Sequence, residues 1–204
     1  MDIAGAKLKN SDIIAFFARL APKWDSDYTT KNEDVINRIL DNAGVRTGKD
    51  VLDVACGTGI LIPYFLEREA GSVTAIDITP EMAEIARKKF PQEHVRIICG
   101  DATETDFGQL FDCIVIYNAL PHFPDPDLLI SRLSSLLKED GILTVAHGMS
   151  REKINAVHNS NSAQAVSAGL MTAEKLAEIF NKYLTVTTMI SDDDMYQVAG
   201  KKKD

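Results

Sequence analysis

The sequence predicts an α/β fold: a doubly wound sheet of seven strands, five of them parallel and the last two forming an antiparallel hairpin. From residue 51 onward, short β-branched runs alternate with longer helical patterns, which is typical of parallel strands joined by crossover helices. Near the end of the chain, two strand-like runs are separated only by Ser191–Asp194, a link too short for a parallel return. The length of 204 residues and the absence of an internal repeat indicate one domain.

The elements of the sheet follow from apolar periodicity. Parallel strands are expected over Val51–Ala55, Val73–Asp77, Val95–Cys99, Cys113–Tyr117 and Ile142–His147. Helices are expected between them over Ile60–Arg68, Pro80–Phe90 and Pro126–Lys138. The Thr79 hydroxyl and the Asp125 carboxylate precede helix-starting prolines and are expected to act as caps, and Gly141 is expected to end the last helix.

Two regions flank this alternation. Before it, amphipathic patterns predict helices over Ser11–Leu20 and Glu33–Asn42. After it, helical patterns cover Arg151–His158 and Ala173–Lys182, and the hairpin strands are Thr185–Ile190 and Met195–Gly200. The single domain therefore divides into an N-terminal helical segment over residues 1–44, a core over 45–148, an insertion over 149–171, and a C-terminal helix and hairpin over 172–204.

Composition excludes several classes of protein. The formal charge of −8 and the pI of about 5.0 argue against a nucleic-acid partner, which normally requires clustered basic residues. No run approaches the roughly 20 apolar residues that span a bilayer, and the start of the chain lacks a basic signal-peptide segment. We therefore expect a cytoplasmic protein with no membrane partner. The three cysteines, Cys56, Cys99 and Cys113, lie in apolar stretches and predict buried thiols rather than disulfides.

The turn after the first expected strand carries the strongest functional signal. Gly57 and Gly59 let the backbone turn tightly and approach a ligand closely. Asp53 lies inside the strand before them, and Asp77 ends the second strand, where open α/β sheets place a carboxylate that holds ribose hydroxyls. Both acids also have a structural interpretation: Asp53 could satisfy backbone amides, and Asp77 could cap the helix after Thr79.

Over residues 45–200, the sequence resembles the class I S-adenosylmethionine-dependent methyltransferases. The resemblance rests on five ordered stretches, namely Asp53–Gly59, Ala75–Met82, Cys99–Ala102, Phe111–Asn118 and Leu136–Leu143. It implies a Rossmann-like methyltransferase fold with S-adenosylmethionine as the cofactor. The N-terminal stretch Phe16–Asp25 is similar to that of the small-molecule enzymes of this class, including the ubiquinone/menaquinone C-methyltransferase-like branch.

The resemblance also implies roles for individual residues. The backbone around the two glycines would lie against the methionine part of the cofactor, with Ala55 standing where many members have glycine. Asp77 would bind both ribose hydroxyls, and Ile78 would lie beside the adenine. Asp101 and Ala102 would recognise the adenine amine, although Asp101 could also be a turn residue. The implied cofactor-binding residues are Asp53, Ala55, Gly57, Gly59, Asp77, Ile78, Met82, Asp101, Ala102, Asn118, Trp24 and Tyr28.

The N-terminal segment would close over the cofactor as a lid, again by resemblance. Trp24 and Tyr28 would then exclude water from the reacting sulfonium. Trp24 could equally fill the core between the first two helices. Asn118 and the insertion would form walls of the acceptor site.

Histidines supply the candidate bases. His122 follows the fourth strand and His147 ends the fifth, so both should lie at the carboxyl edge of the sheet, where such folds bind substrates. An imidazole with an unperturbed pKa near 6.5 suits removal of a proton at neutral pH. His122 is the first choice and His147 the second, although either could be structural. A metal or metalloid acceptor is a weaker alternative, because no tight ligand spacing is present, and we expect no bound metal.

The sequence thus favours a methyltransferase that acts on a small-molecule acceptor by in-line displacement. Neither the acceptor nor the oligomeric state can be derived from it. One alternative is a nicotinamide-dependent oxidoreductase, although the chain lacks a third glycine after Gly57 and Gly59. The other is a non-catalytic module that only binds the cofactor.

Overall fold

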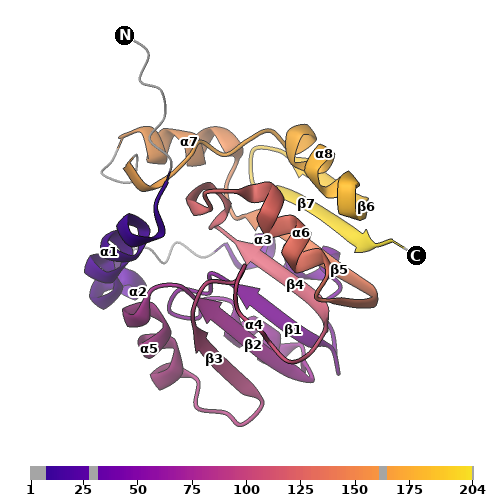
Figure 1. Ribbon diagram of the computed structural model, residues 1–204, viewed down its shortest axis with the longest axis horizontal. Helices are drawn as coiled ribbons and strands as arrows, with labels where there is room; N and C mark the ends of the chain where they lie inside the picture. The colour runs from indigo at the N-terminus through magenta and orange to yellow at the C-terminus, as the bar shows by residue number, and fades with distance from the viewer. Residues whose placement is uncertain (1–7, 28–31, 161–164, 204) are drawn as a thin grey trace.

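A seven-stranded sheet in the order β3-β2-β1-β4-β5-β7-β6 forms the centre of the protein (Figure 1). The computed structural model describes residues 8–27, 32–160 and 165–203, without the side chains of 27 and 158–160. The strands are β1 (Asp50–Val54), β2 (Ser72–Asp77), β3 (Val95–Cys99), β4 (Phe111–Tyr117), β5 (Leu137–His147), β6 (Leu184–Ser191) and β7 (Tyr196–Lys202). Strands β1 to β5 pair in parallel, and β7 pairs antiparallel with both β5 and β6, which confirms the expected fold class.

Helices cover both faces of the sheet. The helical elements are α1 (Asn10–Leu20), η1 (Ala21–Lys23), α2 (Trp24–Asp27), α3 (Glu33–Asn42), α4 (Ile62–Glu67), α5 (Pro80–Lys89), η2 (Leu120–His122), α6 (Pro126–Ser134), α7 (Arg151–Ser160) and α8 (Ala173–Tyr183). One core packs α6 and α8 against the sheet through residues such as Leu133 and Phe180. The other packs α3 and α4 through residues such as Ile39 and Phe65. Figure 1 shows these two helical layers in front of and behind the strands.

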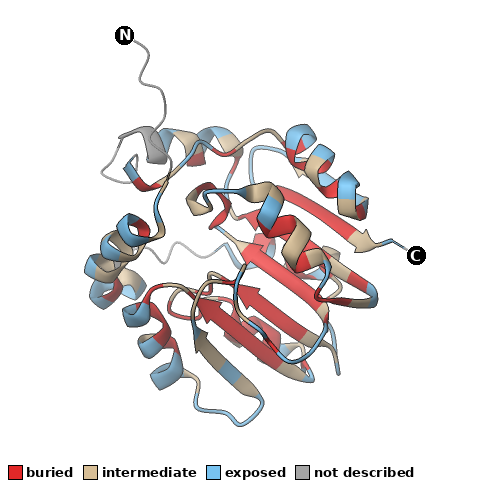
Figure 2. Cartoon of the chain, viewed as in Figure 1, coloured by how far each residue is buried: buried red, intermediate tan, exposed pale blue. Residues whose placement is uncertain are grey.

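Burial differs between the centre and the edge of the sheet. Strands β1 and β2 are buried along almost their whole length, as expected for parallel strands covered on both faces (Figure 2). Strand β3 is an edge strand and is half exposed. Its last residue, Cys99, is exposed, so the expectation of three buried thiols is wrong at this position. The apolar run around Cys99 is typical of a buried strand, but among the described residues β3 has a neighbouring strand, β2, on one side only.

The boundary between α6 and β5 differs from the expectation. Helix α6 ends at Ser134, four residues before the expected end at Lys138, and β5 already begins at Leu137. Leu137 pairs with Phe111 across the sheet, and an irregularity follows before the regular pairing of Cys113 with Ile142. Gly141 therefore lies inside the strand and does not end the helix. Cross-strand pairing with β4 outweighs the helical pattern here.

The helix caps were predicted correctly at one of two positions. The Asp125 carboxylate accepts a hydrogen bond from the Leu128 amide at 3.0 Å and caps α6. Thr79 stands at the N-cap of α5 but its side chain makes no capping bond, so its expected role is wrong. Its backbone amide instead donates to the Asp77 carboxylate at 2.8 Å.

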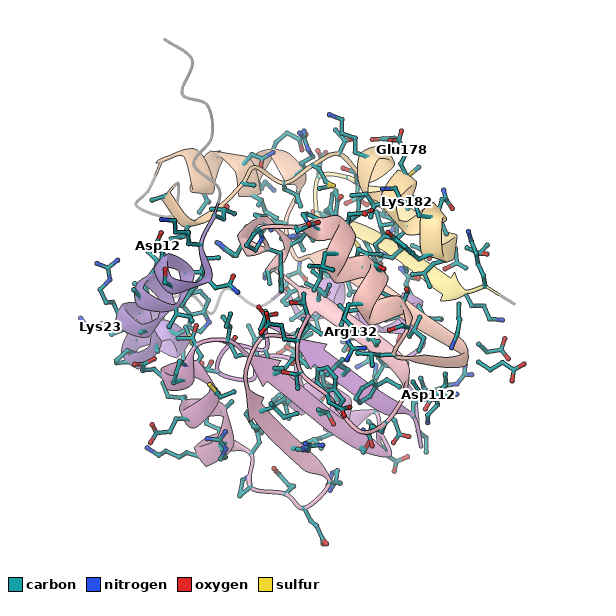
Figure 3. All side chains as sticks on the ribbon, in the orientation of Figure 1. Asp12, Lys23, Asp112, Arg132, Glu178 and Lys182 are labelled. Atoms are coloured by element: carbon teal, nitrogen blue, oxygen red, sulfur yellow. The ribbon has the colours of Figure 1, made fainter. Side chains whose placement is uncertain are left out.

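A network of charges holds the amino ends of the parallel strands together. Asp112 accepts hydrogen bonds from Lys49 at 2.9 Å, from Lys138 at 2.8 Å and from the Asp50 amide at 2.9 Å. Lys138 also donates to Asp50 at 2.6 Å. Figure 3 shows Asp112 at the opposite end of the molecule from the α1–η1 segment. These contacts give Asp112 a structural role at the edge of the sheet away from the α1–η1 segment.

Candidate active site

A pocket of about 410 Å³ opens at the carboxyl ends of the parallel strands, between the sheet and helix α1. This is where open α/β sheets bind ligands. Its volume lies in the usual range for sites that hold small molecules and cofactors. The lining residues come from α1, from Trp24, from the ends of β1, β2 and β4, from the residues after β3, and from η2 and the start of α6.

The glycine-rich turn forms one wall of this pocket. Ala55, Gly57 and Gly59 all have positive φ angles, of 56°, 57° and 87°, so the backbone turns in a way that favours glycine. A methyl group on Gly59 would lie 2.5 Å from the ring of Phe90, so glycine is needed there for packing. The nearest atom to a methyl on Gly57 would be Trp24 Nε1, at 3.8 Å, which leaves space on the pocket side of the turn.

Asp77 joins this turn to helix α5. One of its oxygens accepts a hydrogen bond from the Gly57 amide and the other from the Thr79 amide, each at 2.8 Å. The side chain also lines the pocket. Burial raises the pKa of Asp77, and the two amide bonds oppose that shift. A carboxylate oxygen has more than one lone pair, so Asp77 can accept further hydrogen bonds from a ligand.

Asp53 lies beneath the turn and does not line the pocket. It is 2% exposed, and its Oδ2 has no hydrogen-bond partner among the described residues. Burial, together with the nearby charge of Asp77, raises the pKa of Asp53 well above its ordinary value. The same burial raises the pKa of the Cys56 thiol, which fits the structural role expected of that cysteine.

Asp101 is already engaged by the N-terminal helix. Its Oδ2 accepts from the Asn10 side chain at 2.8 Å, and its Oδ1 accepts from the amide and hydroxyl of Thr103 at 2.8 and 2.7 Å. The turn interpretation is therefore correct for one oxygen. Asn10 and Asp101 both line the pocket, so their hydrogen bond closes one side of it.

The structure brings His122 to the pocket and leaves His147 outside its lining. His122 Nδ1–H donates to the backbone oxygen of Val166 at 2.9 Å, and the ring packs edge-on against Phe17 at 4.9 Å. His147 is 2% exposed and packs against Tyr196 at the end of β5. Val166 belongs to the insertion, which therefore fixes the orientation of the first-choice base.

The N-terminal segment covers the glycine-rich turn. Trp24 lines the pocket and packs edge-on against Phe17 at 5.6 Å, so it contributes to the pocket and not only to a helix interface. Asp25 accepts from the Thr58 hydroxyl at 2.6 Å and from Lys89 at 2.8 Å, which ties this segment to the turn and to α5. Tyr28, expected beside Trp24, lies outside the described residues.

The remaining candidates all line the pocket, namely Ile78, Met82, Ala102 and Asn118. Asn118 has a positive φ of 54°, and its side-chain oxygen accepts from the Gly148 amide at 3.0 Å. Sequence reasoning missed Asn10, Phe17 and Asp25. Phe17 and Asp25 lie in the stretch Phe16–Asp25 that the resemblance marked, whereas Asn10 lies outside it.

Two further features of the described residues bear on the class of site. Within the described residues, no group of three His, Cys, Asp or Glu side chains is arranged to hold a metal ion. In the same part of the chain, every helix is too short or too polar to cross a bilayer.

Solved structures that match this fold include methyltransferases. The N-methyltransferase NodS from Bradyrhizobium japonicum, solved with S-adenosyl-L-homocysteine, matches with a TM-score of 0.71 at 16% identity, over 96% of this chain and 99% of its own. A chain from the complex of the Haloferax volcanii Trm112 methyltransferase activator with a methyltransferase matches with a TM-score of 0.74 at 16% identity, over 98% and 100%. At such low identity these matches show a shared Rossmann-like methyltransferase fold.

The family match is more specific. Residues 51–141 match the family model described as a methyltransferase domain, so this part of the chain is a methyltransferase domain, as the resemblance predicted. Malonyl-[acyl-carrier protein] O-methyltransferase from Acetivibrio thermocellus is 34% identical over 62% of this chain and 46% of its own length. Ubiquinone biosynthesis O-methyltransferase from Actinobacillus pleuropneumoniae is 34% identical over 67% and 63%. The chain thus aligns with about half to two thirds of these relatives, and neither is named an oxidoreductase.

Proposed function

We propose that this protein transfers the methyl group of S-adenosylmethionine to a small-molecule acceptor. The observation that carries this proposal is the convergence of the glycine-rich turn, Asp77 and Asp101 on one pocket of a methyltransferase domain. When bound, S-adenosylmethionine supplies a methyl group on a positively charged sulfur. The protein then has to align the two reactants and exclude water.

The described residues fit the parts of this cofactor. The space beside Gly57 admits its methionine portion, and Asp77 accepts hydrogen bonds from its ribose hydroxyls. Ile78, Met82 and Ala102 offer an apolar surface to the adenine, with Asp101 at its amine. Asp53 lies under the site, and a positively charged ligand would favour the ionised form of its carboxyl group and be stabilised by it.

His122 serves as the general base where the acceptor carries a proton. Its Nδ1–H is committed to the Val166 carbonyl, so the lone pair of the neutral ring is on Nε2. His147, buried against Tyr196, is not needed for this role. The segment over residues 1–44 acts as the lid, and the insertion over 149–171 positions the base. The cytoplasmic location expected from the sequence stays a prediction.

Calorimetry with S-adenosylhomocysteine tests the cofactor site. The wild-type protein should bind it, and Asp77→Asn should weaken binding by about tenfold or more, because the loss of a charged hydrogen-bond acceptor costs about 1.5–3 kcal/mol. Asp106→Asn, an exposed acid outside the pocket lining, is the matched control and should leave the affinity unchanged. No heat of binding with millimolar ligand would refute the proposal.

The base is tested first by NMR on histidine labelled with ¹⁵N. His122 should show a protonated Nδ1 and an unprotonated Nε2 at neutral pH, and the opposite tautomer would remove the assignment. With any acceptor that is turned over, His122→Ala should lower single-turnover methyl transfer by about 10²-fold or more. His94→Ala, at an exposed position on the opposite edge, should change nothing.

A further inference from the structure

The part of the pocket that remains beside the cofactor-facing residues is mainly apolar. It is lined by Ile13 and Phe17 of α1, by Phe123 and Pro124 after η2, and by Leu128 of α6. Leu128 is 55% exposed, a high value for a large apolar side chain. His122 contributes the polar group between them. An apolar molecule bound beside the cofactor would bury this surface.

The charges that line the pocket are all negative. The acidic lining residues are Asp77, Asp101, Glu104 and Asp125, and the described lining contains no lysine or arginine. Asp125 is held in place because its carboxylate caps α6 through the Leu128 amide. Lys89, a nearby cation, forms a salt bridge with Asp25 at 2.8 Å, outside the pocket lining.

This arrangement discriminates by charge. An anionic group on the acceptor would lose water and meet fixed carboxylates without a counter-charge from the described lining, and like-charge juxtaposition is strongly unfavourable. A protonated amine would be attracted, but it has to lose its proton before its nitrogen can attack a methyl group. An uncharged acceptor meets neither cost and gains the apolar contacts.

We infer that the acceptor is an uncharged, mainly apolar small molecule that carries no carboxylate or phosphate. The inference rests on the proposed function, because it concerns the space beside the cofactor. It separates this chain from its relative named for malonyl-[acyl-carrier protein], since a malonyl group that carries a free carboxylate would not suit this lining. Asp125, which directly follows Phe123 and Pro124, is the acid that sets the charge preference beside this apolar part of the lining.

Binding of matched probes to the complex with S-adenosylhomocysteine tests the inference. Each set holds a methyl ester, the corresponding free acid and the corresponding amine, built on 4-hydroxybenzoate and on two larger ring systems. Trp24 is the only tryptophan and lines the pocket, so its fluorescence reports occupancy. The ester should bind about tenfold or more tightly than its acid.

Charge-neutralising variants sharpen the test. Asp125→Asn, whose side chain can still cap α6, should narrow the difference between ester and acid. Asp106→Asn, which makes the same charge change outside the pocket lining, should not. The inference is overturned if any acid binds as tightly as its ester, if an amine both binds as tightly as its ester and is methylated by S-adenosylmethionine, or if no ester binds in the millimolar range. Failure of S-adenosylhomocysteine itself to bind would instead overturn the proposed function.

Discussion

Asp53 lies in an environment that is unfavourable for a charged side chain. Its carboxylate is buried, and its Oδ2 lacks a hydrogen-bond partner in the described structure. An amide in the same place avoids the cost of a buried charge, so Asp53→Asn should raise the free energy of unfolding of the ligand-free protein by about 1–2 kcal/mol at pH 8. The same change should weaken binding of S-adenosylmethionine, because the negative charge beneath the site is lost.

The direction of the pH dependence follows from the raised pKa of Asp53. Between its unfolded and folded pKa values the folded state binds more protons, so the stability of the wild type falls as pH rises through that window. The advantage of Asp53→Asn should therefore shrink as pH is lowered toward 4. Urea denaturation at several pH values measures this, with Asp193→Asn in the exposed hairpin turn as the control. A variant less stable than the wild type at pH 8 would contradict the argument.

Individual residues were predictable where local chemistry marks them. Gly57 follows the end of β1 and Asp77 ends β2, so the strand pattern of the sequence is enough to locate both. Both line the pocket. The contact of Asn10 with Asp101 joins residues 91 positions apart, and no local sequence pattern near either residue predicts it. Like His122, His147 lies at the carboxyl edge of the sheet, but a position at this edge does not determine which way the side chain points.

The two glycines of the turn are needed for different reasons: Gly59 for packing against Phe90, and Gly57 for the space assigned to the cofactor. Gly59→Ala should destabilise the protein by about 2–4 kcal/mol, because the backbone has φ of 87° and the methyl would overlap Phe90. Gly57→Ala has room for its methyl and should cost only about 1 kcal/mol, from its positive φ. That methyl lies in the space assigned to the cofactor, so Gly57→Ala should reduce S-adenosylhomocysteine affinity by about tenfold or more.

Thermal unfolding and calorimetry together distinguish the two glycines. Ala55→Gly serves as the matched change in the same turn, because it relieves a positive φ of 56° without adding an atom. Equal losses of stability in Gly57→Ala and Gly59→Ala would show that the close packing of Gly59 against Phe90 is not decisive.

Helices and strands were predicted well in position and less well at their ends. The helix expected over Glu33–Asn42 and the strand expected over Val95–Cys99 have the observed bounds. The end of α6 was misplaced because Leu137 looks like a continuation of the helix and its partner Phe111 is far away in sequence. The apolar periodicity of a sequence indicates that a residue is buried, but it does not indicate which neighbour buries it.

The whole molecule depends on a charge network at the amino edge of the sheet as well as on its core. Lys138 and Lys49 lower the pKa of Asp112 to about 2. Because the folded pKa lies below the unfolded one, this contribution to stability is present above about pH 4 and is lost as pH falls toward 2. Asp112→Asn should therefore lower the free energy of unfolding by about 1–2 kcal/mol at pH 7, after allowance for the partly exposed lysines.

Chemical denaturation at pH 7 and pH 2.5 checks this prediction. The difference between Asp112→Asn and the wild type should largely disappear at the lower pH. Glu139→Gln, an exposed acid next to Lys138, should show little difference at either pH. A difference that persists unchanged at pH 2.5 would mean that the side chain acts through packing and not through its charge.

The overall architecture was predictable because few sheet arrangements fit the alternation of strands and helices, the chain length and the short Ser191–Asp194 link. The place of the N-terminal segment over the turn was predictable only in part, because its contacts through Asn10 and Asp25 depend on a tertiary fold that brings the chain back over the turn.

The hydrogen bond between His122 and the segment around Val166 affects which substitutions this protein can tolerate. The bond ends on a backbone carbonyl at residue 166, and a second backbone bond joins Ala168 N to Pro121 O at 2.7 Å. Neither bond depends on which side chain occupies these positions. Substitutions in this segment can therefore accumulate without altering the tautomer of His122. A scan of alanine substitutions would overlook the segment, and only a change in its length would expose its contribution.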